Sequence, residues 1–236
     1  MIPLKDENPR RSFPIVNYVL IGINIIIFFY EMSLGRGLNY FFLKYGLIPY
    51  EITRFKDIPP FVSHPVILNI FTSMFLHGSF MHIAGNMLYL YIFGDNVEDA
   101  LGHIRYFFFY ILSGIGAALA QIIITPSSLI PNIGASGAIS GVLGAYVLLY
   151  PHARVITLIP DPFTFGLFYR LTKIPALFFI GFWFILQFFQ GILTLPYAGK
   201  TGGVAWWAHI GGFITGIILV LLYYSSLTGM RRYRRL

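Results

Sequence analysis

Two polar residues of the chain stand in segments that are otherwise apolar and rich in glycine. Ser136 lies within Gly-Ala-Ser-Gly at the start of one segment, and His209 lies within Ala-His-Ile-Gly-Gly near the start of another. A serine hydroxyl becomes an effective nucleophile when a neutral imidazole within hydrogen-bond reach accepts its proton. The two residues therefore predict acyl-transfer chemistry, provided that the fold brings their segments together.

The composition places this pair in a membrane. Of the 236 residues, 57% are hydrophobic, 18% are aromatic and only 11% are charged, and the mean hydropathy is +0.73. A soluble domain carries about a quarter of charged residues, so we predict a protein that crosses the bilayer several times. Polar side chains are costly inside a bilayer and mark functional sites there. The absence of cysteine excludes disulfides, thiol nucleophiles and thiolate metal sites.

Six apolar runs are candidates for membrane helices, since a helix rises about 1.5 Å per residue and the hydrocarbon core is about 30 Å thick. They cover about 15–32, 79–98, 104–124, 136–150, 174–194 and 204–224. The first run has basic flanks, but it is long and no small-residue cleavage site of a signal peptide follows it. We therefore predict an all-α polytopic membrane protein in which residues 1–236 form a single domain of six transmembrane helices.

The basic residues predict the orientation of these helices, because cytoplasmic loops carry the excess of Lys and Arg. Eleven of the sixteen fall on one side of the six runs: Lys5, Arg10, Arg11, Arg105, Arg154, Arg170, Lys173, Arg231, Arg232, Arg234 and Arg235. Both termini are therefore expected in the cytoplasm. The net charge of +7 is then a signal of topology and of attraction to anionic lipid headgroups, and not of nucleic-acid binding.

The region before the second predicted helix departs from a simple pattern of spans. The apolar stretch from Pro65 to Phe93 is about thirty residues long, which exceeds one crossing, and Gly78-Ser79 interrupts it. We expect residues 66–76 to pack against the bundle and the second helix to begin near Ser79. The long first loop, 33–78, is aromatic and interrupted by proline, so we expect it to associate with the outer leaflet of the membrane.

The fourth predicted helix is short. From Ser136 to Tyr150 there are fourteen steps, or roughly 21 Å of helix, which falls short of the bilayer by about 9 Å. His209 is also fourteen residues from the aromatic Tyr223 at the end of the last run. Measured from the inner interface, Ser136 and His209 are therefore expected at similar depths, below the outer surface. Irregular backbone at that depth requires surrounding protein or a water-filled cavity.

Glycines supply a means for the two helices to approach each other. Gly137 and Gly141 lie on the fourth predicted helix, and Gly212 and Gly216 lie on the sixth. Small residues at such spacing let transmembrane backbones come close. Glycines by themselves indicate only close helix packing, which occurs in any membrane bundle. Here a polar residue precedes each set of glycines, and this favours a functional site.

The predicted base lacks a carboxylate partner, because no Asp or Glu occurs within the fourth, fifth or sixth run. The arrangement is therefore a Ser-His dyad, unlike the triad of soluble serine proteases. A helix that starts at Ser136 points free N–H groups at a reacting carbonyl. His82 and Asn86 are four residues apart on one helical face, and we predict that they stabilise the oxyanion. For an intramembrane Asn alone, an interhelical hydrogen bond is the structural alternative.

These residues together resemble the rhomboid family of intramembrane serine proteases, of the bacterial six-helix type. The matching motifs are His82 and Asn86 in HxxxN, Ser136 in Gly-Ala-Ser-Gly, and His209 in Ala-His-x-Gly-Gly-Phe-x-x-Gly. The opening Met-Ile-Pro-Leu-Lys-Asp-Glu-Asn-Pro and Asn-Val-Glu-Asp-Ala-Leu-Gly at 96–102 also resemble bacterial members. A Trp-Arg motif found in the first loop of some members is not evident.

The resemblance implies a fold, a function and a location. It implies a six-helix bundle that cleaves single-pass transmembrane proteins in or near their membrane segment, with Ser136 as nucleophile and His209 as general base. It also implies a bacterial inner-membrane protein in contact with lipids, with an active site that opens to the extracytoplasmic side and with no cofactor or metal. Glu98 matches a structural glutamate of the family. The resemblance specifies neither a natural substrate nor an oligomeric state.

Other functions fit the sequence less well. A zinc intramembrane protease requires His-Glu-x-x-His, which is absent. An aspartyl intramembrane protease requires two membrane-embedded aspartates, and here Asp95 lies at the end of a predicted helix without a second one. His77, His82 and His209 have no spacing typical of metal ligands. A transporter usually shows repeated broken helices or charges within the membrane, and the sequence has no convincing internal repeat and no charged residue deep in a predicted span. The alternative that stays open is a non-catalytic rhomboid-like protein that binds transmembrane helices without cutting them.

Overall fold

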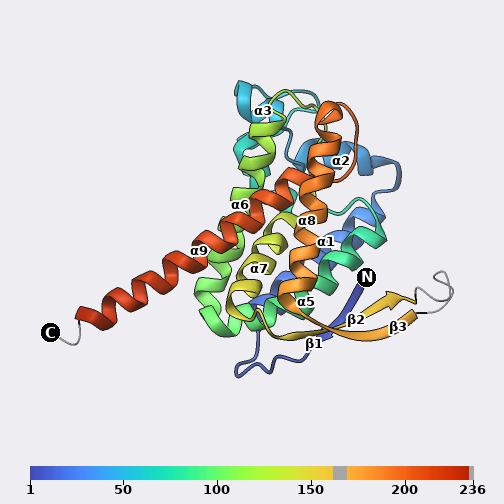
Figure 1. Cartoon of the computed structure of the whole chain (residues 1–236). Helices are drawn as coiled ribbons and strands as arrows, with labels where there is room; N and C mark the ends of the chain where they lie inside the picture. Colours follow the sequence, from blue (N-terminus) through green and yellow to red (C-terminus); the bar gives the residue numbers. More distant parts are fainter. Residues whose placement is uncertain (162–168, 234–236) are drawn as a thin grey trace.

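The computed structural model describes residues 1–161 and 169–233, most of which are helical (Figure 1). The helices that build the bundle are α1 (Ile15–Ser33), α5 (Phe80–Leu101), α6 (His103–Ile124), α7 (Ser136–Leu149), α8 (Ala176–Thr194) and α9 (Trp206–Tyr233). Shorter helices precede α5, namely α2 (Leu38–Tyr45), α3 (Pro49–Arg54) and α4 (Asn69–Thr72). Each of the predicted apolar runs therefore coincides with a helix of the bundle.

Length and composition identify which helices can cross a membrane. Among the described residues, four helices qualify by themselves: Ile15–Ser33, His103–Ile124, Ala176–Tyr197 and Trp206–Tyr224. The pair Val66–Phe75 and Phe80–Leu101, bent by 80°, makes five if it counts as one span, and Ser136–Leu149 is a shorter apolar helix. The predicted class of polytopic, mainly helical membrane protein is confirmed, whereas the number of six crossings stays a prediction.

The break before α5 is confirmed at Gly78-Ser79. Residues 66–75 form short helical turns of their own, and α5 begins at Phe80. The Ser79 hydroxyl accepts a hydrogen bond from the His82 N–H at 3.2 Å, which caps one of the free donors at the start of α5. This cap determines where the helix starts and therefore the height of His82 and Asn86 in the bundle.

The first loop holds the segment that leads to α7. Leu47 and Asn132 form an isolated antiparallel bridge, with N–H to carbonyl distances of 3.0 Å and 2.8 Å in the two directions. In Figure 1, α2 and α3 lie at the end of the bundle opposite the sheet. The loop at 33–78 is thus folded against the protein, and it pins the backbone four residues before Ser136.

Glu98 joins α5 to the start of α1. Its side chain is fully buried, and its two carboxylate oxygens accept from the N–H groups of Val16 at 3.0 Å and Asn17 at 2.7 Å. A carboxylate at a helix N-terminus satisfies free donors and interacts favourably with the helix dipole. The residue therefore has a structural position between two helices.

A small antiparallel sheet closes one end of the bundle, and the sequence analysis did not anticipate it. Its strands are β1 (Ile2–Asp6), β2 (Arg154–Pro160) and β3 (Tyr169–Pro175), in the order β1-β2-β3. Asp6 anchors β1 to the helices, because it accepts from Asn96 at 3.2 Å and from the Tyr146 hydroxyl. Burial, opposed in part by the Tyr146 hydrogen bond, raises the pKa of Asp6 to about 6.

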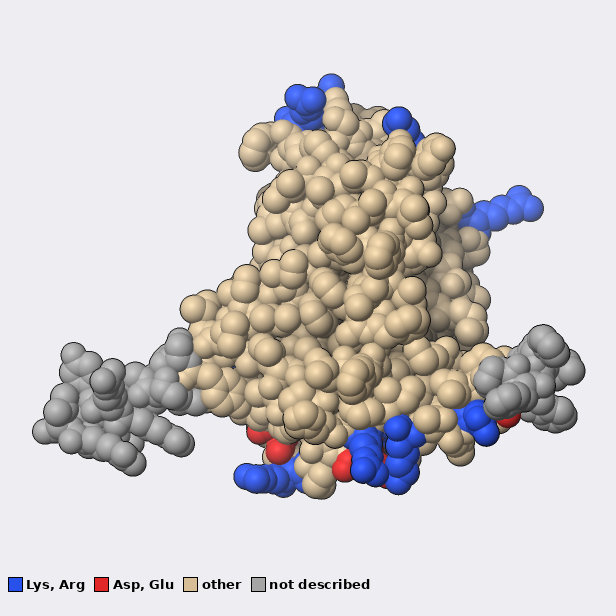
Figure 2. Space-filling view, in the orientation of Figure 1, with Lys and Arg blue, Asp and Glu red and all other residues tan. Residues whose placement is uncertain are grey.

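The charges lie at the two ends of the molecule. Figure 2 shows most Lys and Arg atoms at the end that carries the sheet, fewer at the opposite end, and a wide uncharged band between them. An apolar belt with charged ends is the surface expected of a protein surrounded by lipid. The orientation of these ends in a membrane stays a prediction.

Helix α7 is the centre of the bundle, in contact with α5, α6, α8 and α9. Its side chains from Gly137 to Tyr146 are all buried. Glycines allow α9 to approach it closely: a Cβ added at Gly212 would overlap the carbonyl oxygen of Gly137, and one added at Gly216 would overlap that of Gly141. The two backbones are therefore in direct contact along the face that carries Ser136 and His209.

We expect Gly212→Val to force α9 away from α7, because the contact is with backbone that no rotamer change can move aside. Overpacking of this kind lowers the free energy of unfolding by about 1–3 kcal/mol or more. The measurement is the melting temperature in detergent. Gly181→Val in α8 is the control, since no atom of the described residues lies within 4 Å of a Cβ at that position. Equal melting temperatures for the two variants would contradict the packing argument.

Candidate active site

Ser136 is the first residue of α7 and is only partly buried. The preceding Gly134 has a φ of 128°, which side-chain-bearing residues rarely adopt. A Cβ at Gly134 would lie 2.8 Å from Nε2 of His82, so glycine also leaves room for that ring. The Gly134 N–H donates to the Ser73 carbonyl at 2.8 Å. The conformation of Gly134 and its hydrogen bond to Ser73 therefore fix the backbone that leads into Ser136.

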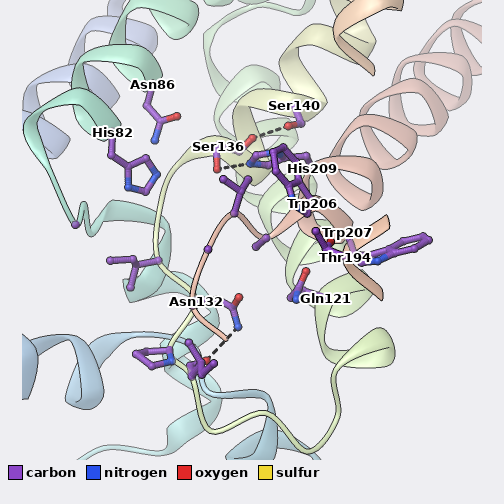
Figure 3. A pocket seen from close by; sticks show the side chains of 18 of the residues that line it. His82, Asn86, Gln121, Asn132, Ser136, Ser140, Thr194, Trp206, Trp207 and His209 are labelled. Carbon is purple, nitrogen blue, oxygen red and sulfur yellow. Dashed lines mark hydrogen bonds between the residues drawn. The ribbon is translucent and has the colours of Figure 1, made fainter. Parts of the chain in front are cut away.

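His209 lies in the first turn of α9, and its ring is held at both nitrogens. Nε2 is 2.8 Å from Oγ of Ser136, and Nδ1 is 2.7 Å from Oε1 of Gln187 in α8. Figure 3 shows the bond between Ser136 and His209. The two residues that the sequence analysis selected from distant segments thus lie within hydrogen-bond distance, in the geometry required of a nucleophile and its base.

Aromatic rings enclose His209. The ring of Trp183 lies 5.9 Å from the imidazole, and that of Trp206 lies 6.3 Å away in an edge-on arrangement. The exposed fraction of His209 is only 9%. An imidazole packed in this way has little freedom to rotate away from Ser136.

His82 and Asn86 face Ser136 from α5 and line the same cavity (Figure 3). Nδ2 of Asn86 is 2.9 Å from Nε2 of His77, a buried residue of the loop before α5. The backbone N–H of His77 in turn donates to both carboxylate oxygens of the buried Glu31, at 3.1 Å and 3.2 Å. Asn86 thus bonds to the loop before α5 and not to another helix, and it has a second amide N–H left for the cavity. Its role in stabilising an oxyanion stays a prediction.

The cavity has a volume of about 820 Å³. Its walls come from α5, α7, α8 and α9 and from the irregular segments that precede α7 and α9. This volume is in the range of sites that hold drug-sized ligands. Among the described residues, no group of three or more His, Asp or Glu side chains is placed to hold a metal ion.

Some polar residues near the site were missed by sequence reasoning. Gln187 contacts His209, Glu31 contacts His77, and Oε1 of Gln121 accepts from the Ala208 N–H at 3.2 Å. Each of them is a polar residue inside an apolar helix, which is a signal that the sequence does contain. Nothing in their spacing indicates which partner each one contacts, however, since the partners are 22 to 87 residues away.

The chain is similar to a set of known membrane proteins. The family model described as "Rhomboid domain" matches residues 65–226. "Rhomboid protein 1, mitochondrial" of Saccharomyces cerevisiae is 29% identical over 93% of this chain and 56% of its own length. "Rhomboid protease AarA" of Providencia stuartii is 28% identical over 86% of this chain and 70% of its own length.

"Rhomboid protease GluP" of Bacillus subtilis is 30% identical over 62% of this chain and 28% of its own length. The chain thus spans about half, or less, of the length of most of the relatives it matches. The family match itself covers more than half of the chain, including all the residues that line the cavity. It is in agreement with the helical membrane fold and with the motifs around Ser136 and His209. The chain therefore belongs to the rhomboid family.

Proposed function

We propose that this rhomboid-family membrane protein is a serine endopeptidase that cleaves single-pass transmembrane proteins in or near their membrane segment. The observation that carries the proposal is the 2.8 Å separation of Ser136 Oγ and His209 Nε2 inside the cavity. Two of the relatives are named rhomboid proteases, which supports the same activity. The whole of residues 1–236 is proposed to act as one membrane domain.

The chemistry follows from this pair. Ser136 Oγ attacks the carbonyl carbon of the scissile peptide bond while Nε2 of His209 takes the hydroxyl proton. The tetrahedral intermediate collapses, and the C–N bond breaks as His209 gives that proton to the leaving amine. A water molecule, deprotonated by His209, then attacks the acyl-enzyme ester. Cleavage of this ester releases the second product, and His209 returns the proton to the Ser136 oxygen.

The negative oxygen of the intermediate needs donors that are already in place. The N–H groups at the start of α7 and the second amide N–H of Asn86 are proposed for this role, together with His82. The bond from Asn86 to His77 holds the amide in one orientation, so the two functions of Asn86 are compatible. Such preorganised donors cost no reorganisation when the charge develops.

The substrate must lose helical structure before it can be cut. Peptide carbonyls in a regular helix are hydrogen-bonded and shielded, whereas attack by Ser136 requires an accessible carbonyl. Helix-weakening residues after the scissile bond, and a small residue before it, are therefore proposed features of a substrate. The irregular segments that line the cavity would receive the unwound strand.

We propose that both termini and the sheet lie in the cytoplasm of a bacterial cell, and that the cavity opens on the opposite side of six spans. The absence of cysteine makes this orientation testable with single-cysteine variants. Arg36→Cys is expected to react with a membrane-impermeant maleimide in intact cells, and Arg154→Cys to react only after lysis, because the two exposed residues lie at opposite ends. The reverse pattern would contradict the orientation.

Labelling with a fluorophosphonate probe tests the proposed activity directly. Detergent-solubilised protein is expected to be labelled, and Ser136→Ala and His209→Ala are expected to lose the label, because the serine is reactive only beside its base. Ser113→Ala is the control, since Ser113 is a buried serine in α6 whose hydroxyl has no hydrogen-bond partner in the part of the chain that the structure describes. Absence of label on folded protein, repeated in lipid, would favour a non-catalytic binder of transmembrane helices.

Asn86→Ala tests the oxyanion role. We expect kcat on a transmembrane substrate to fall about 10- to 1000-fold, because the loss of one oxyanion donor costs up to about 1000-fold in kcat. Asn24→Ala is a matched control, because Asn24 is a buried asparagine of α1 whose amide, among the described residues, bonds only to the Leu20 carbonyl. Melting temperatures establish that both variants are folded. A wild-type kcat in Asn86→Ala would return Asn86 to a purely structural role.

A further inference from the structure

The second nitrogen of His209 is held by a residue that the dyad does not include. Nδ1 lies 2.7 Å from the side-chain oxygen of Gln187. An amide oxygen can only accept a hydrogen bond, so Nδ1 must carry the imidazole proton. In the neutral ring Nε2 is then unprotonated and presents its lone pair to the Ser136 hydroxyl 2.8 Å away. This is the tautomer that a general base requires.

The location of Gln187 supports a specific task. It lies in the middle of α8, a mainly apolar helix, and its exposed fraction is 8%. Burying an amide is costly unless it is hydrogen-bonded. Within the described part of the chain, the one hydrogen bond of the Gln187 side chain goes to His209. Trp183, one turn earlier on α8, packs against the same imidazole ring. One face of α8 thus determines both the orientation and the protonation pattern of the base.

We propose that Gln187 is a positioning residue for His209 and completes a Ser136–His209–Gln187 relay. This inference rests on the proposed function. In soluble serine proteases a buried carboxylate holds the histidine in its correct tautomer. A charged carboxylate is costly inside a membrane, and a neutral amide fixes the same tautomer without introducing a charge.

The chain offers a matched control on the same helix. Gln190 is three residues after Gln187, and its side chain is exposed. Gln187→Met keeps a similar length and volume but removes the acceptor, whereas Gln187→Glu retains an acceptor oxygen at the same position. Gln190→Met makes the same chemical change away from the imidazole. Together these variants separate the hydrogen bond from simple packing.

We expect Gln187→Met to lower kcat and the rate of fluorophosphonate labelling about 10- to 100-fold, the size of the effect when the hydrogen-bond partner of a metal-bound histidine is removed. KM and the melting temperature should change little, since volume is kept. Gln187→Glu should recover most of the rate, and Gln190→Met should keep all of it. Wild-type kinetics in Gln187→Met, or failure of Gln187→Glu to recover activity when its melting temperature equals that of the wild type, would overturn the proposal.

Nitrogen-15 NMR of histidine-labelled protein tests the tautomer independently of catalysis, with His209→Ala identifying the signals of His209. The wild type is expected to carry the proton on Nδ1, and Gln187→Met to show a mixture of tautomers. A wild-type proton on Nε2 would refute the role of Gln187. If the Nδ1–H tautomer is present and depends on Gln187 but Ser136 does not label, the proposed protease function fails while the positioning role stands.

Discussion

The candidate site depends on the direct contact of two helix backbones. Helices α7 and α9 carry Ser136 and His209, and they approach so closely that Gly212 lies against the carbonyl of Gly137. In a bilayer, helix association is driven by close packing and interhelical hydrogen bonds, since lipid and side chains are similarly apolar. A displacement of about 1 Å between reacting groups can already cost two orders of magnitude in rate. Small residues on the shared face are therefore a condition for the chemistry.

Hydrogen bonds to buried polar groups then orient the side chains that this packing brings together. Gln187 bonds to His209, and His77 bonds to Asn86 while its own backbone is held by Glu31. Glu98 performs a similar task for the start of α1. An unpaired polar group is costly in an apolar interior, so each of these pairs strongly favours one arrangement of its helices. The buried polar groups thus form a framework that holds the helices of the bundle in place.

The two ends of the bundle differ in how they are closed. At one end, β1 joins the β2–β3 hairpin and is anchored through Asp6 to α5 and α7. At the other, irregular segments surround the cavity, and the Leu47–Asn132 bridge holds the one that leads to Ser136. Irregular backbone is tolerated within membrane proteins where it lines a cavity. The end with the cavity is thus the one suited to receive an extended chain.

The sequence by itself determined the membrane class, the helix positions and the break before α5, because long apolar runs, glycines and a serine cap act through local physics. It also indicated Ser136 and His209 as a pair, since isolated polar residues beside glycines are unusual in lipid-facing segments. The tertiary structure decided which side chains and strands from distant parts of the chain contact each other. Gln187 meets His209 from a different helix, and Ile2 pairs with Leu158 to form a sheet with no strong local signal. Such contacts join residues far apart in the chain, and only the packed bundle specifies them.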